Sequence, residues 1–443
     1  MAPGLDGRPE RIANWLGNVV ADVDAVLRPR SITELQEMIG GARDRLLVMG
    51  GRMSKTALMD PPGRRALDMR GLNAIVEHGP DSVTVGGGIT VFDLSRALYE
   101  RGRQIPGFTI TADPSVGGSI TAPTKGANHP FNPGANGVSG AVLRARVVRP
   151  DGELVELQAG RDDEALALLR DSYSAAGVVA EATLRTRSLA SADVHEEVLP
   201  LPRFLEDTDL HRRALEQRTL VFPKLGLIVM RVHENRRPAE PEAPFESLLT
   251  GPNTPYVRLA RVLPRAARAG VLRAAVRLGI DRKTRHRLHV QNLTPYPRDG
   301  SAYLDFITWS LPIGRFAETL PRIVTFCRTH PDYPAESLIE IFRTFPENRF
   351  LDADERVAID PVSFDRREGP RWERFYRDYN RMILELGASP FLNQTRYITA
   401  SDMRAVYGAR YDAWRDALLQ IDPTRKLGSR YLDQVLGAAG DER

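Results

Sequence analysis

Two glycine-rich loops in the first third of the chain carry residue types that bind phosphate groups. Leu46–Lys55 reads L-L-V-M-G-G-R-M-S-K, and Pro114–Ile120 reads P-S-V-G-G-S-I. Glycine lets the backbone approach a ligand closely, and successive N–H groups in such turns form anion-binding concavities. Together the two loops predict one ligand that contains a diphosphate. Neither has the G-x-G-x-x-G or G-x-x-x-x-G-K-[ST] pattern, so they do not indicate a Rossmann fold or a P-loop.

Short strands and amphipathic helices must position these loops. Ser31–Asp44 predicts a helix, with Ser31 as N-cap and Glu34 in the position of a capping box. Thr90–Glu100 predicts a second helix with one apolar face. The predicted strands are Leu46–Met49, Ala66–Asp68, Ser82–Gly86 and a hairpin of Val142–Val148 with Leu154–Leu157 around a P-D-G turn. This alternation indicates an α+β nucleotide-binding domain in two subdomains.

The composition changes after about Ala190. His195–Pro244 predicts irregular structure that ends in an exposed loop, R-R-P-A-E-P-E-A-P. Farther along, Tyr303–Trp309 and Leu338–Phe345 predict strands of a second sheet, and Arg371–Leu386 and Asp402–Leu419 predict helices. A sheet with helices in this region is suited to a cap over a bound ligand.

Val257–Arg287 is basic and amphipathic, which leaves two interpretations. Such a segment could lie on an anionic membrane surface. Alternatively, it forms a pair of surface helices whose arginine stems cover apolar area. We favour the surface helices, because Pro264 interrupts the pattern and lysine is almost absent.

Length and cysteine content indicate the class of protein. A chain of 443 residues is too long for one hydrophobic core and predicts at least two domains. The sequence contains no apolar run of the roughly 18 residues that a membrane span needs, and its N-terminus lacks the apolar region of a secretory signal. Cys327 is the single cysteine, which excludes an internal disulfide. We therefore expect a cytoplasmic protein.

The charge balance does not indicate a nucleic-acid partner. The chain has 61 basic and 57 acidic residues, and only five of the basic residues are lysines. The arginines are scattered and interleaved with acidic residues, whereas a nucleic-acid footprint gathers them on one face. The arginine bias is typical of a GC-rich codon composition.

A series of short motifs resembles the FAD-binding domain of the vanillyl-alcohol oxidase superfamily. In chain order they are R-P-R-S-I-T-E-L, V-M-G-G-R-M-S, A-L-D-M-R-G-L-N, V-T-V-G-G-G-I-T-V-F-D-L, P-S-V-G-G-S-I, V-V-R-P-D-G-E and A-G-V-V-A-E-A-T-L-R. Near the end, R-A-V-Y-G-A-R-Y-D-A-W-R and I-D-P-T-R-K-L-G-S-R-Y-L resemble the C-terminal signature of aldonolactone oxidases. V-Q-N-L-T and I-F-R-T-F resemble the decaprenylphosphoryl-ribose oxidase branch.

The resemblance implies an α+β fold with a PCMH-type FAD-binding domain in two subdomains. An α+β cap domain with an antiparallel sheet follows, together with C-terminal helices. We place the FAD-binding domain at residues 10–190 and the substrate domain at residues 191–400. Residues 401–443 are expected to return to the FAD-binding domain as a helical segment.

The resemblance also implies which residues hold FAD. The first loop, Gly50, Gly51, Arg52, Met53 and Ser54, would bind the pyrophosphate, and Pro114, Ser115, Gly117 and Gly118 would complete that site. Thr121, Ala122 and Gly126 would approach the edge of the isoalloxazine ring. Gly177 and Val178 resemble a turn that contacts the adenine side or the dimethylbenzene region, although Gly177 could equally be a simple turn glycine. Relatives with a covalent flavin carry a histidine where this chain has Met53, so we expect non-covalent FAD.

The reacting pocket departs from the related branch at several positions. That branch has H-G-K-N-H where this chain has K-G-A-N-H, so Lys125 replaces a histidine, and His129 remains. Gln394 and Arg343 stand where the branch has lysines. Gln394 cannot be a base, whereas Arg343 would stabilise an alkoxide or bind a carboxylate or phosphate.

Several roles therefore stay open. Lys125 is either the base, with a pKa lowered by desolvation, or a positive charge near flavin N1 and O2. His129 is either a second titratable group or a loop histidine that caps the backbone, and Asn292 either orients substrate or caps a strand end.

The leading hypothesis is an FAD-dependent oxidoreductase that oxidises a CH–OH group of a sugar, polyol, lactone or similar metabolite, with a base near the hydroxyl. Oxygen or another acceptor would reoxidise the flavin, and no metal is expected. One alternative is a flavoenzyme that tailors a natural-product intermediate, which the lost lysines favour. The other is a redox-inactive flavin-binding protein.

Overall fold

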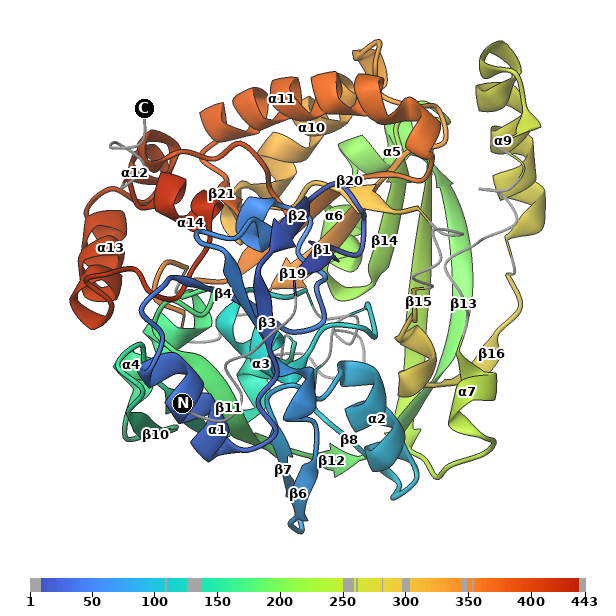
Figure 1. The fold of residues 1–443 in the computed structure, drawn as a ribbon. Helices are drawn as coiled ribbons and strands as arrows, with labels where there is room; N and C mark the ends of the chain where they lie inside the picture. Colours follow the sequence, from blue (N-terminus) through green and yellow to red (C-terminus); the bar gives the residue numbers. More distant parts are fainter. Residues whose placement is uncertain are drawn as a thin grey trace.

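The computed structural model describes most of the chain (Figure 1). The described residues are 9–107, 110–125, 137–249, 259, 262–280, 282–296, 303–344, 349–352 and 354–437. Gly126 and His129 lie outside these ranges, so their predicted roles stay predictions.

A small parallel sheet carries the first glycine-rich loop. Its order is β3 (Ala25–Leu27), β5 (Arg65–Asp68) and β4 (Leu46–Met49). Helix α1 (Ile32–Gly40) connects β3 to β4, and the Ser31 side chain caps it by accepting the Glu34 N–H. Parallel strands need such a crossover, and Leu35, Met38 and Ile39 of α1 are buried. The hairpin of β1 (Glu10–Ala13) and β2 (Val20–Val23) precedes this sheet.

An antiparallel sheet supports the second glycine-rich loop. Its strands, in order, are β10 (Leu154–Gln158), β9 (Val142–Val148), β11 (Val178–Arg185), β7 (Ser82–Gly86) and β6 (Ile75–His78). The helices of this region are α2 (Val91–Tyr99), α3 (Val116–Thr121) and α4 (Asp163–Arg170). A short pair of β8 (Arg103–Gln104) and β12 (Arg187–Ser188) leads into the next sheet.

The large antiparallel sheet forms the second half of the molecule. Its order is β16 (Arg285–Leu288), β13 (Ala190–Pro200), β15 (Leu227–Pro238), β14 (Arg218–Phe222), β19 (Leu338–Thr344), β20 (Arg356–Ser363), β18 (Trp309–Pro312) and β21 (Ser389–Pro390), and β17 (Asp305–Phe306) pairs with β20. Side chains alternate between the two faces of a strand, so each strand supplies residues to both faces of this sheet.

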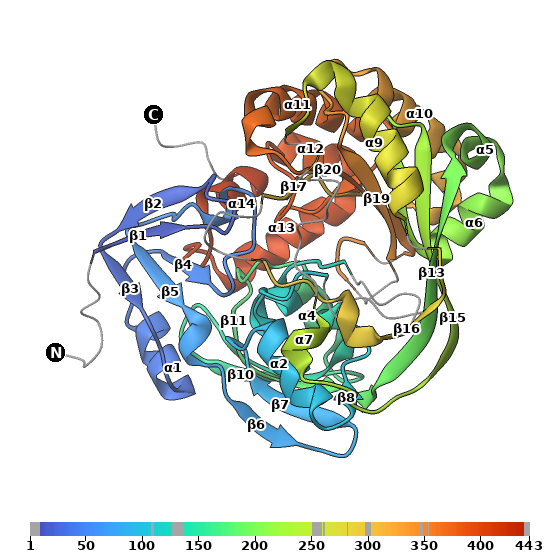
Figure 2. The ribbon, with the colours of Figure 1, turned by 90° about the vertical axis from the view of Figure 1, so that its right-hand side faces the viewer.

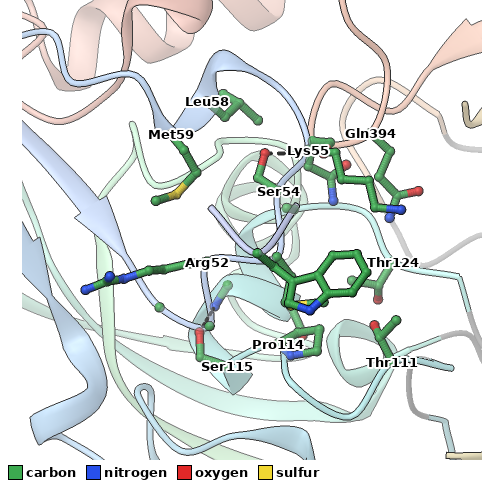
Figure 3. Close-up of a pocket in the computed structure, with 18 of the residues that line it drawn as sticks. Arg52, Ser54, Lys55, Leu58, Met59, Thr111, Pro114, Ser115, Thr124 and Gln394 are labelled. Atoms are coloured by element: carbon green, nitrogen blue, oxygen red, sulfur yellow. Dashed lines mark hydrogen bonds between the residues drawn. The ribbon is translucent and has the colours of Figure 1, made fainter. Parts of the chain in front are cut away.

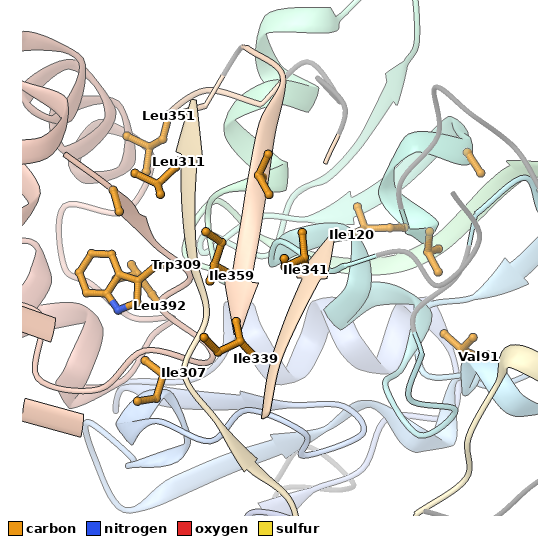
Figure 4. Packing of buried hydrophobic residues seen from close by; sticks show 14 of the residues in the cluster. Val91, Ile120, Ile307, Trp309, Leu311, Ile339, Ile341, Leu351, Ile359 and Leu392 are labelled. Atoms are coloured by element: carbon orange, nitrogen blue, oxygen red, sulfur yellow. The ribbon is translucent and has the colours of Figure 1, made fainter. Parts of the chain in front are cut away.

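One face of the large sheet is apolar and covered by helices. These are α5 (Leu201–Glu206), α6 (Thr208–Glu216), α10 (Phe316–Thr329) and α11 (Gly369–Glu385). Ile339, Ile341, Ile359 and Trp309 pack together in this core (Figure 4). Figures 1 and 2 show α10 and α11 at the top, with β6, β7 and α2 below.

The opposite face is apolar at one end only. There α9 (Arg265–Gly279) buries Leu272 and Val276 against Phe222 and Leu338. Helix α9 lies at the edge of the molecule, beside β13 and β15 (Figure 1). A short helix, α7 (Phe245–Leu248), lies near α2. None of the described helices is both long and apolar enough to cross a bilayer.

The C-terminal helices pack back on the first part of the chain. They are α12 (Ala400–Tyr407), α13 (Ala409–Ile421) and α14 (Arg430–Val435). The Leu46 N–H of β4 donates to the Lys426 carbonyl at 2.7 Å, and Leu427 forms a parallel bridge with Leu46. Arg45 forms a two-point ion pair with Asp433, at 2.7 and 2.8 Å.

Three predictions from the sequence are wrong. The segment 195–244 is not irregular: it contains most of β13, α5, α6, β14 and β15. The period-two pattern of β13 was hidden because its consecutive charged residues Glu196 and Glu197 lie on opposite faces, where they pair with Arg231 and Arg213. Tyr303–Trp309 is divided between β17 and the start of β18. Asp402–Leu419 is two helices, because Gly408 takes a positive φ of 55° and ends α12.

A buried ion pair connects three distant segments around Asp171. Arg349 donates to the Asp171 carboxylate at 2.8 and 2.5 Å, and the Leu351 N–H donates to its second oxygen at 2.9 Å. The Trp414 indole N–H of α13 donates to the Asp171 carbonyl at 3.2 Å. Burial raises the pKa of Asp171 despite this neighbouring cation.

Replacing Arg349 should therefore destabilise the whole molecule. Arg349→Met leaves a buried carboxylate without its cation, which costs about 3 kcal/mol of unfolding free energy. The matched control is Arg64→Met, which removes an exposed ion pair with Asp24 and should leave stability unchanged within error. Urea denaturation followed by tryptophan fluorescence measures both variants. Equal effects would contradict a special contribution from the Asp171 pair.

Candidate active site

A deep cleft separates the glycine-rich loops from the large sheet. Its empty volume is about 1330 Å³, including the part open to solvent. Of the residues predicted to bind a cofactor or act in catalysis, it is lined by Gly50, Gly51, Arg52, Met53, Ser54, Pro114, Ser115, Gly118, Thr121, Ala122, Lys125 and Gln394. Gly428 and Ser429 from the C-terminal segment complete one wall. The structure thus brings most of the predicted residues into one site (Figure 3).

The two loops contact each other backbone to backbone, which explains their glycines. A Cβ atom on Gly51 would lie 2.1 Å from the Asp113 carbonyl oxygen, and one on Gly50 would lie 1.9 Å from Ser115 Oγ. Between them, Arg52 takes a positive φ of 59° and pairs with Asp68 at 3.1 Å. This packing creates a narrow concavity between the two loops, which suits a pyrophosphate.

Three other predicted residues lie outside the cleft lining. Gly117 donates its N–H to the Gly87 carbonyl at 2.7 Å, so it packs α3 against the end of β7. Gly177 has φ of 137°, and a Cβ there would lie 2.6 Å from Val147 Cγ1. Val178 begins β11 and is buried opposite Val148. Packing accounts for these residues, and their contacts with a cofactor stay predictions.

Lys125 is buried where the second loop meets the large sheet. Its ammonium forms an ion pair with Asp360 of β20 and donates to Thr308 Oγ1 at 3.0 Å. Burial lowers the pKa of Lys125 from its usual value to about 7, and the charge of Glu340 opposes this shift. The adjacent Asp360 carboxylate likewise favours the ammonium form. Lys125 can therefore hold a proton or release it near neutral pH.

Gln394 is connected to Lys125 through Thr308. The Thr308 hydroxyl donates to Gln394 Oε1 at 2.6 Å, so the three side chains form a short hydrogen-bonded chain. The Gln394 backbone is fixed as well, because the Tyr376 hydroxyl donates to its carbonyl at 2.8 Å. Gln394 lines the cleft next to Lys55 (Figure 3).

The structure does not bring Arg343 and Asn292 into this site. Arg343 follows Glu340 by three residues on β19, so alternation places the two side chains on opposite faces of the sheet. It forms an ion pair with Glu355 instead. Asn292 is buried and donates to the His289 carbonyl at 3.2 Å within a turn.

Sequence reasoning missed Lys55 and Glu340. Lys55 lies directly after the first loop, and its ammonium donates to the Leu304 carbonyl at 2.8 Å inside the cleft. Glu340 lines the cleft from β19. The signal for Lys55 was the rarity of lysine: two of the five lysines in the chain lie in this one cleft. Glu340 gave no signal, because sequence does not show which face of a strand meets the ligand.

Known proteins share both the sequence pattern and the fold. Residues 23–158 match the family model of an FAD binding domain. An L-gulono-1,4-lactone dehydrogenase from Mycobacterium tuberculosis is 26% identical over 96% of this chain and 99% of its own length. A D-arabinono-1,4-lactone oxidase from Eremothecium gossypii is 27% identical over 44% of this chain and 37% of its own. An alditol oxidase from a Streptomyces species is 27% identical over 39% of this chain and 41% of its own.

The chain is an FAD-dependent oxidoreductase, similar in sequence to lactone dehydrogenases and oxidases and to an alditol oxidase. This confirms the resemblance inferred from its motifs. Cholesterol oxidase from Brevibacterium sterolicum has the same fold, with a TM-score of 0.73, 15% identity and 97% of each chain covered. That likeness confirms the fold class, a PCMH-type FAD domain followed by an antiparallel sheet with helices.

Adding a methyl group at Gly51 should prevent this flavoenzyme from binding its cofactor. In Gly51→Ala the new methyl group meets the Asp113 carbonyl, and the two loops must separate. We expect FAD binding to weaken so far that the FAD content of the purified protein falls at least about tenfold. The flavin absorbance per protein measures it. Gly270→Ala on α9, where nothing lies within 4 Å, is the control and should retain FAD. Full FAD content in Gly51→Ala would contradict the assignment of this loop.

Proposed function

We propose that this flavoenzyme oxidises a CH–OH group of a sugar, polyol, lactone or related hydroxylated metabolite. The observation that carries the proposal is Lys125, buried in the cleft and hydrogen-bonded to Thr308 within reach of Gln394. The named activities of the relatives, on aldonolactones and alditols, support the same substrate class. FAD, when bound, supplies the hydride acceptor at its N5 atom.

Lys125 has the properties of the base. Hydride removal from carbon is assisted when a group near the hydroxyl takes its proton. A lysine amine with a pKa near 7 is partly neutral at physiological pH and can accept that proton. Asp360 then stabilises the resulting ammonium ion through the ion pair.

Gln394 and Thr308 position the reacting groups. Thr308 accepts a hydrogen bond from Lys125 and donates one to Gln394, which fixes the direction of both side chains. Because the Gln394 carboxamide oxygen accepts this bond, its NH₂ group is directed elsewhere and can donate to a substrate hydroxyl. Gln394 would thus orient the substrate rather than move a proton.

Replacing the base should reduce flavin reduction and change its pH dependence. In Lys125→Ala, the rate with L-gulono-1,4-lactone or an alditol should fall at least about tenfold, equivalent to roughly 1.4 kcal/mol. Because the neutral amine is the active form, the unmodified enzyme should gain rate as pH rises through about 7. The variant should lose this inflection.

Anaerobic bleaching of the flavin absorbance measures these rates. Lys283→Ala, at an exposed lysine outside the cleft lining, is the matched control and should behave as the unmodified enzyme. A loss of less than tenfold in Lys125→Ala, with the pH inflection retained, would exclude Lys125 as the base.

We further propose that FAD is bound without a covalent link. Among the described residues that line the cleft there is no histidine or cysteine. Met53 occupies the position at which relatives with a covalent flavin have histidine, and a thioether cannot form that bond. Cys327 is buried in α10, among the helices of the large sheet.

Acid precipitation distinguishes the two kinds of attachment. Since nothing joins the flavin to the chain, the yellow colour should appear in the supernatant after the protein is precipitated. Absorption spectra of pellet and supernatant measure the distribution. Colour that stays in the pellet would contradict the proposal and would direct attention to His129.

Oxygen or another small acceptor would reoxidise the flavin, and we place the protein in the cytoplasm. The single buried thiol is consistent with a reducing compartment. Redox inactivity is the less favoured alternative, because a site that only held flavin would not need a buried lysine and its ion pair.

A further inference from the structure

Lys55 is a buried cation at the wall of the cleft. Its side chain is 3% exposed, and its ammonium donates to the Leu304 carbonyl at 2.8 Å. It also lies 2.9 Å from the centre of the Phe306 ring and 5.7 Å from that of Trp15. Within the described part of the chain, no carboxylate oxygen lies within 4.0 Å of this ammonium. Burying an ammonium without an opposite charge is costly, so an anion should complete this position.

The neighbouring charges are already paired with one another. A row of ion pairs crosses the cleft face of the large sheet: Glu196 with Arg231 at 2.6 Å, Arg218 with Glu340 at 3.1 Å, and Asp360 with Lys125. Asp305, which follows Leu304, is held by Arg396 at 2.5 Å and by the Trp372 indole N–H at 3.0 Å. Arg396 also pairs with Glu373, at 3.1 Å. These carboxylates are thus in contact with other cations and not with the Lys55 ammonium, which leaves room for an anion to contact it.

Lys55 lies on the side of the cleft where the substrate would react. Lys55 and Lys125 both lie near the Phe306 ring, at 2.9 and 4.2 Å from its centre. Figure 3 shows Lys55 beside Gln394, whereas Ser115 and Pro114 of the second loop lie on the opposite side. An anion at Lys55 would thus sit close to the proposed base and away from the second pyrophosphate loop.

We propose that Lys55 binds a carboxylate group of the substrate, so that the substrate is a hydroxy acid such as an open-chain sugar acid. The inference rests on the proposed function and specifies its substrate class. Lys55 acts by binding and orienting this carboxylate. Burial lowers the pKa of Lys55 well below its usual value, and the charges of Asp305 and Glu340 oppose this shift only in part. A bound carboxylate would favour the ammonium form.

Calorimetric titration of the FAD-loaded protein tests this proposal without turnover. The probes are gluconate and its neutral counterpart glucitol, in which a CH₂OH group replaces the carboxylate. Acetate serves as a minimal carboxylate. Gluconate should bind at least about tenfold more tightly than glucitol, a difference of roughly 1.4 kcal/mol. Acetate should compete with gluconate.

Variants of Lys55 assign the preference to one side chain. Lys55→Met should retain FAD and lose the preference for gluconate, whereas Lys55→Arg should keep most of it. The matched control is Lys224→Met, because the Lys224 ammonium also donates to a backbone carbonyl, that of His330 at 2.9 Å, but lies outside the cleft lining. This control should bind gluconate as the unmodified protein does.

Three results would overturn the proposal. They are equal affinity for gluconate and glucitol, an unchanged preference in Lys55→Met, and loss of FAD from Lys55→Met. The last result would assign the cation to the cofactor pyrophosphate rather than to a substrate. Because binding is measured without catalysis, failure of Lys125 as the base would leave these outcomes unaffected, and the two proposals can fail separately.

Discussion

The ion pair between Lys125 and Asp360 joins the two halves of the active site. Lys125 follows the second glycine-rich loop, and Asp360 lies on a central strand of the large sheet. Burying either charge alone would lower the stability of the fold, because each charge needs the other to offset its lost hydration. The contact therefore fixes the distance between the loops proposed to hold FAD and the sheet face proposed to meet the substrate.

The large sheet provides this contact because its two faces have opposite character. Isoleucines on one face pack under α10 and α11, while the alternate residues of the same strands present Glu340 to the cleft and Asp360 to Lys125. These two carboxylates are direct cross-strand neighbours, an arrangement that repels in isolation. Arg218 and Lys125 each neutralise one of them. One face of the sheet thus carries ion pairs, and the other face packs against a rigid apolar core.

Much of this arrangement could be predicted from the sequence. Particular residues show which parts could not be predicted. The strands and helices around the glycine loops were predicted well, since caps such as Ser31 and Thr90 and the P-D-G turn act locally. The pairing of β13 with β15 could not be predicted, because Glu196 and Arg231 look like surface residues until each is opposite the other. Arg343 was placed by alignment with a related motif, which does not distinguish the two faces of a strand. The proposed domain boundaries at residues 190 and 400 stay predictions.

The position of Lys426 and Leu427 beside β4 has a consequence for the order of events during synthesis. Leu46 leads into the first glycine loop, yet its N–H is satisfied by the Lys426 carbonyl, and Gly428 and Ser429 form part of the cleft wall. The ribosome completes residues 23–158 about 270 residues before this segment, at roughly 5–20 residues per second. For tens of seconds the nascent chain therefore lacks the C-terminal segment that completes the cleft. We expect FAD to bind late in maturation for this reason.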